Sequence, residues 1–205
     1  RDPRGNFRFF ENRQKYLLFV HTCSEKRVIA ERVALELASL HPRPPALRVF
    51  DAGCGDGTVL ARVMRSMHVR FPHMPFYIAG KELSLEDVRL TLDKVPDRLF
   101  EHPATVFVLT NMYYAEAPWL MPATSAAASG MIWHEVALRG ASSGEFEAQI
   151  AELGPFLEQN WRANVSPKSG MPIYERPVAL VLYRDDHRFL LDSIIPRAGR
   201  TEANF

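Results

Sequence analysis

The sequence lacks any apolar run long enough to cross a membrane as a helix. Its longest apolar stretches, such as Tyr16 to Val20 and Val178 to Tyr183, have the length of buried strands or helix faces, whereas a membrane-spanning helix needs about 20 residues. Cysteine is also scarce. Cys23 and Cys54 are too few for a disulfide scaffold. Reduced thiols and the absence of a signal-like segment predict a cytoplasmic protein without a membrane partner.

A strong excess of one charge is missing as well. The chain has 25 basic and 24 acidic residues, a balance that gives no general attraction to nucleic acid. Basic residues do gather near its start, at Arg1, Arg4, Arg8, Arg13 and Lys15, but such a cluster is usually a solvated surface. No Cys and His cluster has metal-ligand spacing, because His68, His73 and His102 are scattered. The sequence therefore predicts no metal site.

The chain does contain an alternation of strand and helix patterns. The 205 residues are 47% apolar, which suits one α/β domain. Short apolar segments predict strands over 47–50, 76–79, 105–110, 131–136 and 178–183. The alternation predicts a Rossmann-like parallel sheet with helices on both faces. Ligands on such sheets bind at the carboxyl ends of the strands, near the point where the strand order reverses.

Apolar residues that recur every three or four positions predict the helices. In the first helix, which follows Thr22, these are Ile29, Val33, Leu37 and Leu40. Thr22 and Glu25 have the spacing of a capping box. Further helices are predicted from Thr58, from Ser84 to Val95, from Ser142 and over 189–195. Stretches rich in Pro or Ala, over 41–46, 115–130 and 164–177, separate these elements.

The segment Val49 to Gly57 is the most informative part of the chain. After a short strand it has Asp51 and then glycines at alternate positions, namely Gly53, Gly55 and Gly57. Glycines let a ligand lie against the backbone, and the next helix begins with free N–H groups. A dinucleotide-binding loop has its third glycine one position later. A carboxylate at the strand end favours a cationic ligand over a pyrophosphate.

This segment resembles the first motif of the class I S-adenosylmethionine-dependent methyltransferases, in which two apolar residues and an acid precede x-G-x-G-x-G. The match is complete over Val49 to Gly57. S-adenosylmethionine carries an ammonium group and a sulfonium charge and has no phosphate. The resemblance implies that Asp51, Gly53, Gly55 and Gly57 bind this cofactor. The alternative is a glycine-rich turn from strand to helix without a ligand.

Two further parts of the cofactor site follow from the same resemblance. Glu82, after the second strand, has the place of the acid that binds the ribose hydroxyls, and Leu83 would pack on the adenine. Asn111 and Met112, after the third strand, have the place of the adenine contacts, although the family often has Asp where Asn111 stands. The alternatives are that Glu82 is an ordinary acid at a helix start and that Asn111 merely makes a turn.

Catalytic residues are weakly specified, because methyl transfer mainly requires alignment of donor and acceptor. His134 and Glu135, on the fourth strand, are the candidate proton acceptor and orienting group, or else are structural. Tyr113 and Tyr114 are candidates for the pocket lining. An aromatic N-terminal segment is a candidate lid over the cofactor, or a helix that packs on the sheet; its aromatic residues are Phe7, Phe9, Phe10, Tyr16 and Phe19.

The sequence as a whole predicts an N-terminal helical segment over 1–46 and a cofactor domain over 47–205. The domain is expected to have a class I methyltransferase core whose C-terminal hairpin is absent or truncated. The expected activity is methyl transfer from S-adenosylmethionine to a small molecule or a protein side chain. Alternatives are a non-catalytic S-adenosylmethionine-binding subunit or sensor, and an aminopropyl transferase. A nicotinamide oxidoreductase is less favoured, and the oligomeric state stays open.

Overall fold

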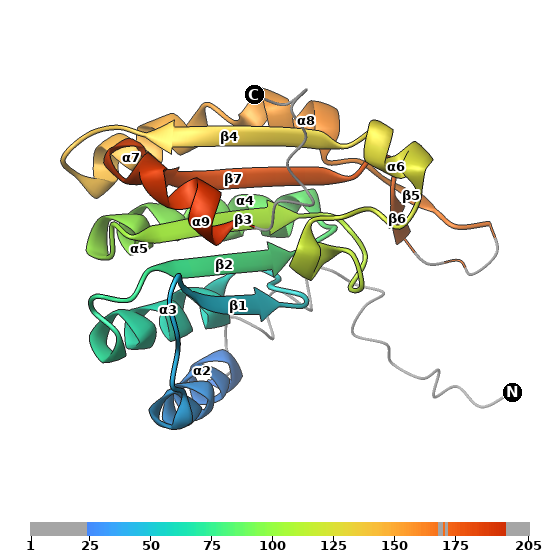
Figure 1. The fold of residues 1–205 in the computed structure, drawn as a ribbon. Helices are drawn as coiled ribbons and strands as arrows, with labels where there is room; N and C mark the ends of the chain where they lie inside the picture. Colours follow the sequence, from blue (N-terminus) through green and yellow to red (C-terminus); the bar gives the residue numbers. More distant parts are fainter. Residues whose placement is uncertain (1–23, 168–169, 171, 196–205) are drawn as a thin grey trace, which may run out of the picture.

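The computed structural model describes residues 24–167, 170 and 172–195, and a five-stranded sheet forms its centre (Figure 1). In chain order the strands of this sheet are β1 (Leu47–Asp51), β2 (Phe76–Lys81), β3 (Thr105–Thr110), β4 (Ile132–Leu138) and β7 (Val178–Arg184). Each of them lies on a predicted apolar segment, so the α/β class is confirmed. The predicted Thr22 cap and N-terminal lid lie outside the described residues.

The direction of the strands differs from the prediction at one pairing. β1, β2 and β3 are parallel to one another, and β4 is parallel to β7, but β7 runs antiparallel to β3. The reason is the segment 111–131, which returns the chain to β4 at the end of the sheet where β3 stops (Figure 1). Helical crossovers join parallel strands, whereas this return reverses the direction. The sheet is therefore mostly parallel rather than wholly parallel.

The strand order is β1-β2-β3-β7-β4, which places the strand before the glycine loop at the edge of the sheet. In a doubly wound Rossmann-like sheet the first strand is central and lies beside the point where the order reverses. Here the order does not reverse beside β1. The fold therefore supports an α/β protein with a mostly parallel sheet, and the more specific class I core remains a prediction.

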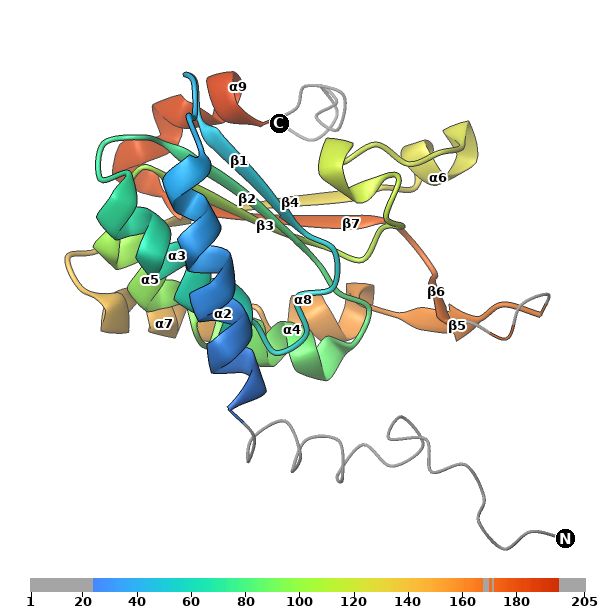
Figure 2. The ribbon, with the colours of Figure 1, turned by 90° about the horizontal axis from the view of Figure 1, so that it is seen from below.

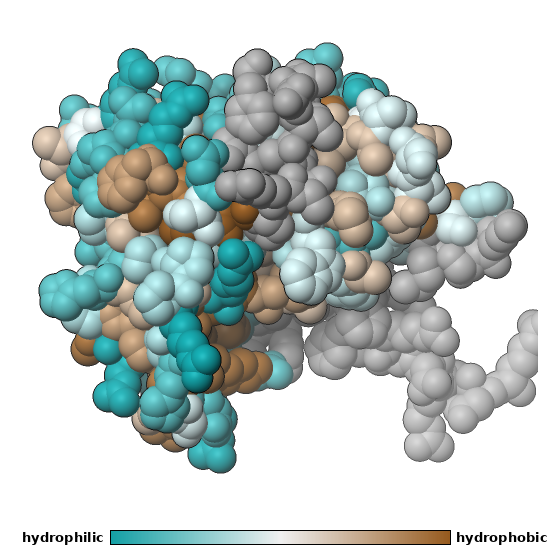
Figure 3. Space-filling model, in the orientation of Figure 1, coloured by the Kyte–Doolittle hydropathy of each residue, from teal (hydrophilic) through white to brown (hydrophobic). Residues whose placement is uncertain are grey.

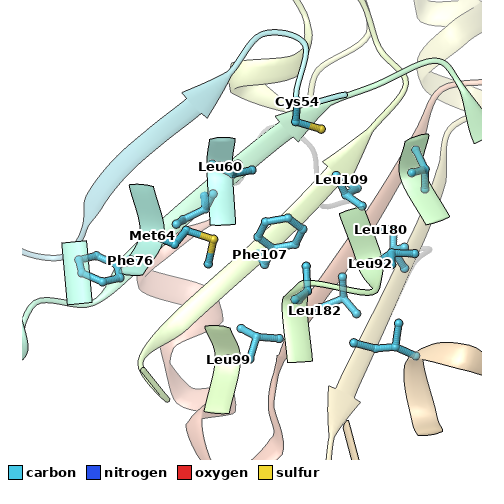
Figure 4. Packing of buried hydrophobic residues seen from close by; sticks show 14 of the residues in the cluster. Cys54, Leu60, Met64, Phe76, Leu92, Leu99, Phe107, Leu109, Leu180 and Leu182 are labelled. Atoms are coloured by element: carbon cyan, nitrogen blue, oxygen red, sulfur yellow. The ribbon is translucent and has the colours of Figure 1, made fainter. Parts of the chain in front are cut away.

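One face of the sheet is covered by a layer of helices (Figure 2). They are α3 (Thr58–Arg70), α4 (Leu85–Leu92), α5 (Val95–Glu101), α7 (Ser143–Ala151) and α8 (Gly154–Asn160). Side chains from these helices and from the strands form one apolar core, in which Met64, Phe76 and Phe107 are almost completely buried (Figure 4). The predicted caps Ser84 and Ser142 are confirmed, because their hydroxyls accept backbone N–H bonds from Asp87 and Glu145.

The other face carries shorter elements: η3 (Ala117–Trp119), η4 (Asp185–Leu190) and α9 (Leu191–Ile194). They bury a second apolar cluster that includes Tyr77, Met112 and Ile194. The prediction of helices on both faces is confirmed, although the two layers are unequal in size. The short helix α6 (Ser125–Ser129) precedes β4.

The first helix, α2 (Glu25–Glu36), packs on α3 and leaves much of its apolar surface exposed. The predicted stripe is wrong in part. Leu37, in the 3-10 turn η2 (Leu37–Ser39), is buried, but Ile29 and Val33 are about two-fifths exposed. The periodicity was compatible with a helix but did not say which face would be covered. No helix in the described residues is long and apolar enough to cross a membrane.

A small hairpin precedes β7 and was not predicted. β5 (Ala163–Val165) and β6 (Pro172–Tyr174) pair antiparallel within a stretch whose prolines had indicated only a break between elements. After β7 the described chain continues into η4 and α9, and it forms no strand up to residue 195. The predicted absence of a C-terminal hairpin also concerns residues 196–205, which lie outside the described part.

Candidate ligand site at the carboxyl ends of β1 to β3

The glycine loop connects β1 to α3 and has the geometry that its sequence implies. Gly55 and Gly57 have φ values of +53° and +73°, in the left-handed region where a side chain is strained. A Cβ atom built on Gly53 or Gly55 would meet nothing within 4 Å. The first two glycines therefore border open space that a ligand could fill.

Gly57 has a different role from the first two glycines. A Cβ atom at this position would lie 2.8 Å from Thr91 Oγ1 and 3.0 Å from Thr91 Cα. The Thr91 hydroxyl in turn donates a 2.8 Å hydrogen bond to the carbonyl oxygen of Gly55. The third glycine thus allows α4 to approach the loop closely, as the third glycine of a dinucleotide loop does for its own helix.

Glu82 follows β2, and its carboxylate lies against the glycine loop. Oε2 accepts a 3.0 Å hydrogen bond from the N–H of Gly55. Oε1 accepts bonds of 2.7 and 2.8 Å from the N–H groups of Leu83 and Ser84. An ionised carboxylate can accept about four hydrogen bonds, so about one acceptor position remains, on Oε2. The structure brings Glu82 to the loop as predicted, and Glu82 also holds the loop in place.

Asp51, at the end of β1, is the second carboxylate of the site. Burial raises the pKa of Asp51, a backbone hydrogen bond from Gly53 lowers it, and repulsion from the nearby Glu82 raises it. The raised pKa means that the fold disfavours the charged form of Asp51. A cation bound beside Asp51 and Glu82 would relieve both the burial and the repulsion. The electrostatics therefore favour a cationic ligand.

Asp56 is an acid in the glycine loop whose carboxylate is already hydrogen-bonded within the protein. It accepts a 2.6 Å bond from Lys26 of α2 and bonds from the backbone N–H and hydroxyl of Thr58. Burial opposes its ionisation, but these three bonds lower the pKa of Asp56. Asp56 thus fixes α2 to the start of α3. Burial also raises the pKa of the Cys54 thiol to about 12, which makes it an inert core group.

Asn111 and Met112 lie at the carboxyl end of β3, but their polar groups are used within the chain. The Asn111 amide donates a 2.9 Å bond to the Arg176 carbonyl and accepts a 2.8 Å bond from the Val178 N–H. The Met112 N–H donates to the Thr110 hydroxyl, and the Met112 side chain is fully buried. This amide joins β3 to the start of β7, so the structure gives it a structural function. Adenine binding by this pair stays a prediction.

His134 and Glu135 are far from the glycine loop. The strand registers place His134 and Asp51 in one row across the sheet, four strand spacings of about 4.8 Å, or about 19 Å, apart. The His134 ring stacks on Phe156 at 4.2 Å, and burial lowers its pKa. Glu135 accepts a 2.8 Å bond from the Trp133 indole. The structure does not bring this pair together with the cofactor-site residues.

Two buried polar residues at this end of the sheet were not predicted from the sequence as site residues. Glu116 is 4% exposed and orders the loop after β3. Lys81 ends β2 and is 7% exposed. Lys81 could have been recognised as a polar residue at the end of a continuous apolar segment. The sequence interpretation assigned a function to the neighbouring Glu82 instead. In the described part of the chain, no three His, Cys, Asp or Glu side chains are grouped to hold a metal ion.

Comparison with models of protein families, with curated proteins and with solved structures finds no match for this chain.

Proposed function

We propose that this protein binds S-adenosylmethionine at the glycine loop and transfers its methyl group to an acceptor. The observation that carries the proposal is the convergence of two carboxylates on this loop: the Glu82 carboxylate accepts the Gly55 N–H at 3.0 Å, and Asp51 lies close enough for Glu82 to raise its pKa. A glycine loop between two carboxylates suits a ligand that is cationic and rich in hydroxyl groups.

The ligand fits this site group by group. Its ammonium group would pair with Asp51, whose pKa is raised by burial and by repulsion from Glu82. A ribose hydroxyl would donate to the remaining acceptor position on Glu82 Oε2. The open space over Gly53 and Gly55 would receive the ligand close to the backbone. The sulfonium supplies the leaving group, so the protein mainly has to align the acceptor and exclude water.

A nicotinamide dinucleotide fits the same residues less well. Its pyrophosphate would lie beside two carboxylates, and like charges at such short range are unfavourable. The third glycine, which in a dinucleotide loop is one position later, is here used to admit Thr91 of α4. We further propose a cytoplasmic location, because the buried Cys54 thiol is free.

The test is calorimetric titration of the protein with S-adenosylmethionine, S-adenosylhomocysteine and NAD. We expect the first two to bind and NAD not to bind. Asp51→Asn and Glu82→Gln should each weaken binding by about 1 to 3 kcal/mol, because each removes a charge-assisted contact. Glu147→Gln, an exposed acid on α7, is the matched control and should bind like the parent.

The proposal fails if neither sulfur ligand binds, or if both site variants bind them like the parent. Binding of NAD in preference to S-adenosylhomocysteine would indicate a nucleotide-dependent oxidoreductase instead.

A second candidate function is S-adenosylmethionine binding without catalysis. The separation between His134 and Asp51 is about 19 Å, at about 4.8 Å per strand. This distance favours binding without catalysis, because His134, the proposed proton acceptor, lies far from the glycine loop. Turnover of S-adenosylmethionine to S-adenosylhomocysteine with any acceptor would exclude this candidate. Turnover that survives His134→Gln would show that the enzyme needs no base at His134.

A further inference from the structure

Lys81 is a buried lysine at the edge of the candidate site, and its ammonium has no anionic partner among the described residues. It alternates with Tyr77 and Ala79 along β2, so its side chain lies on the face that carries η3. Its Nζ lies 4.8 Å from the centroid of the Tyr114 ring. Within residues 24–167, 170 and 172–195, this cation–π contact is the direct interaction found for the ammonium.

Other lysines around the glycine loop are placed differently. Lys26 donates to Asp56 at 2.6 Å, and Lys94 donates to the carbonyl oxygens of Asp56 and Leu90 at 2.8 and 2.7 Å. Both are satisfied by the fold. Burying an ammonium is costly unless it is paired. Lys81 can therefore gain from an anionic ligand, whereas Lys26 and Lys94 already have partners within the fold.

The groups near Lys81 do not neutralise it through a direct bond. The Glu82 carboxylate accepts three backbone N–H bonds and lies against the glycine loop. Burial lowers the pKa of Lys81, while Glu82 and Cys54 raise it. Among the residues that the structure describes, the buried side-chain atoms without a partner are His68 Nε2, Tyr77 OH and His102 Nε2. Lys81 Nζ is not among these atoms.

The Tyr114 ring that borders this ammonium belongs to a segment with a second exposed aromatic residue, Trp119. Tyr114 and Trp119 are 63% and 61% exposed. Pale and light-brown residues mark the segment between β3 and β4 in Figure 3. Buried Glu116 holds this segment by accepting bonds from the Tyr113 and Ala123 N–H groups and the Tyr174 hydroxyl. Exposed aromatic rings are typical of recognition surfaces.

We propose that Lys81 and Tyr114 form a subsite for an aromatic ligand that carries a carboxylate or another anionic group. The ring of the ligand would stack on the exposed aromatic surface, and its anion would pair with the ammonium of Lys81. Lys81 immediately precedes Glu82, so this subsite borders the proposed cofactor site. The subsite depends on the proposed function only in that its ligand would be the methyl acceptor.

The test uses benzoate, benzamide and benzylamine, which share one ring and differ in charge. Binding to the full chain is followed by NMR, with the aromatic signals of Tyr114 as the reporter. We expect benzoate to bind at least about tenfold more tightly than benzylamine, as one charge-assisted contact implies. Lys81→Met, which keeps the apolar stem, should remove this preference and leave benzamide binding unchanged.

Two matched variants separate the parts of the subsite. Lys26→Met removes a lysine that is already paired and should keep the benzoate preference. Tyr114→Ala, at an exposed position, should weaken all three probes by a similar factor, with binding to this variant followed through the NMR signals of the probes themselves. The subsite is contradicted if benzoate does not perturb Tyr114, if the three probes bind equally, or if the preference survives Lys81→Met in a folded variant.

A parallel titration with S-adenosylhomocysteine distinguishes this subsite from the proposed function. Benzoate binding that requires Lys81, without binding of S-adenosylhomocysteine, would overturn the proposed function and leave the subsite. The opposite result would overturn the subsite alone.

Discussion

The two ends of the sheet both contain buried titratable groups, but they use them differently. At the amino end of β2, His68, Phe76 and His102 stack, with 4.3 Å between the ring centroids of Phe76 and His102. At the carboxyl end, Asp51 and Glu82 border the glycine loop. The first cluster is closed, because α3, α5 and β2 cover it. The second lies beside open space over Gly53 and Gly55.

The titratable groups at the amino end therefore belong to the packed core, whereas those at the carboxyl end are placed to bind a ligand. Burial and the neighbouring His102 lower the pKa of His68 to about 4, so the amino end accepts the neutral imidazoles as part of the core. The carboxyl end instead holds Asp51, whose pKa is raised by burial and by the neighbouring Glu82. Such groups at a strand end are typical of ligand sites. The following substitutions test this contrast, from the largest expected effect on stability to the smallest.

Gly57→Ala should be the most destabilising change, by about 2 to 5 kcal/mol, because it combines a left-handed backbone with overpacking against Thr91. Gly53→Ala is the matched control and should stay within about 0.5 kcal/mol of the parent, since its Cβ meets open space. Chemical denaturation measures both. Equal destabilisation by the two substitutions would contradict the assignment of separate roles to these glycines.

Asn111→Ala should cost about 1 to 3 kcal/mol, because it leaves the buried Val178 N–H and Arg176 carbonyl without their partner. Asn111→Asp keeps the acceptor for Val178 but places a buried carboxylate oxygen against the Arg176 carbonyl oxygen, so its loss should be smaller than that of Asn111→Ala only at low pH, where the protonated acid can donate to this carbonyl. Unfolding curves of the two variants measure the difference. A stable Asn111→Ala protein with impaired ligand binding would instead place this amide in the cofactor site.

His68→Gln should reduce the decrease in the free energy of unfolding between pH 6.5 and pH 4. The folded pKa of His68 is depressed to about 4, and the unfolded value is about 6.5. Its neutral form therefore stabilises the fold above about pH 6.5, and this contribution is lost as the pH falls toward 4. His102, Glu101, Arg98 and Arg65 face the same cluster.

Denaturation midpoints between pH 7 and pH 4 measure this effect. Exposed His73→Gln is the control and should follow the parent curve. Parallel pH profiles for His68→Gln and the parent would show that the amino-end cluster does not couple protonation to unfolding.

Asp51→Asn should have the smallest effect on stability, within about 1 kcal/mol, and the effect should be favourable at neutral pH. Because the folded pKa of Asp51 is raised, its contribution is present at low pH and lost as the pH rises through that pKa. The amide removes this loss. The same variant should bind S-adenosylhomocysteine more weakly. A variant that is less stable and binds normally would contradict the assignment of Asp51 to a ligand site.

Local features of the fold could be predicted from the sequence. The bounds of β3 are those expected, and the caps Ser84 and Ser142 act as their spacing implies. The glycine loop and Glu82 also meet as expected. These features depend on turn-forming residues and on the apolar pattern within one segment, both of which can be identified from neighbouring residues in the sequence.

Features that depend on distant pairing could not be predicted. A continuous apolar strand such as β7 has the same pattern whether its neighbour runs parallel or antiparallel, so its direction was missed. The edge position of β1 likewise depends on which strands pair. Because the strand order decides which strand ends lie together, His134 was expected near the loop and lies across the sheet from it.

Hydrogen exchange with and without S-adenosylhomocysteine tests the contrast between the two ends most directly. The account predicts that the ligand protects amides in segments 51–58 and 80–84 and leaves those of 98–105, at the amino end, unchanged. An absence of protection at the glycine loop, or protection confined to the amino end, would contradict the central claim that the carboxyl end of the sheet is the ligand site.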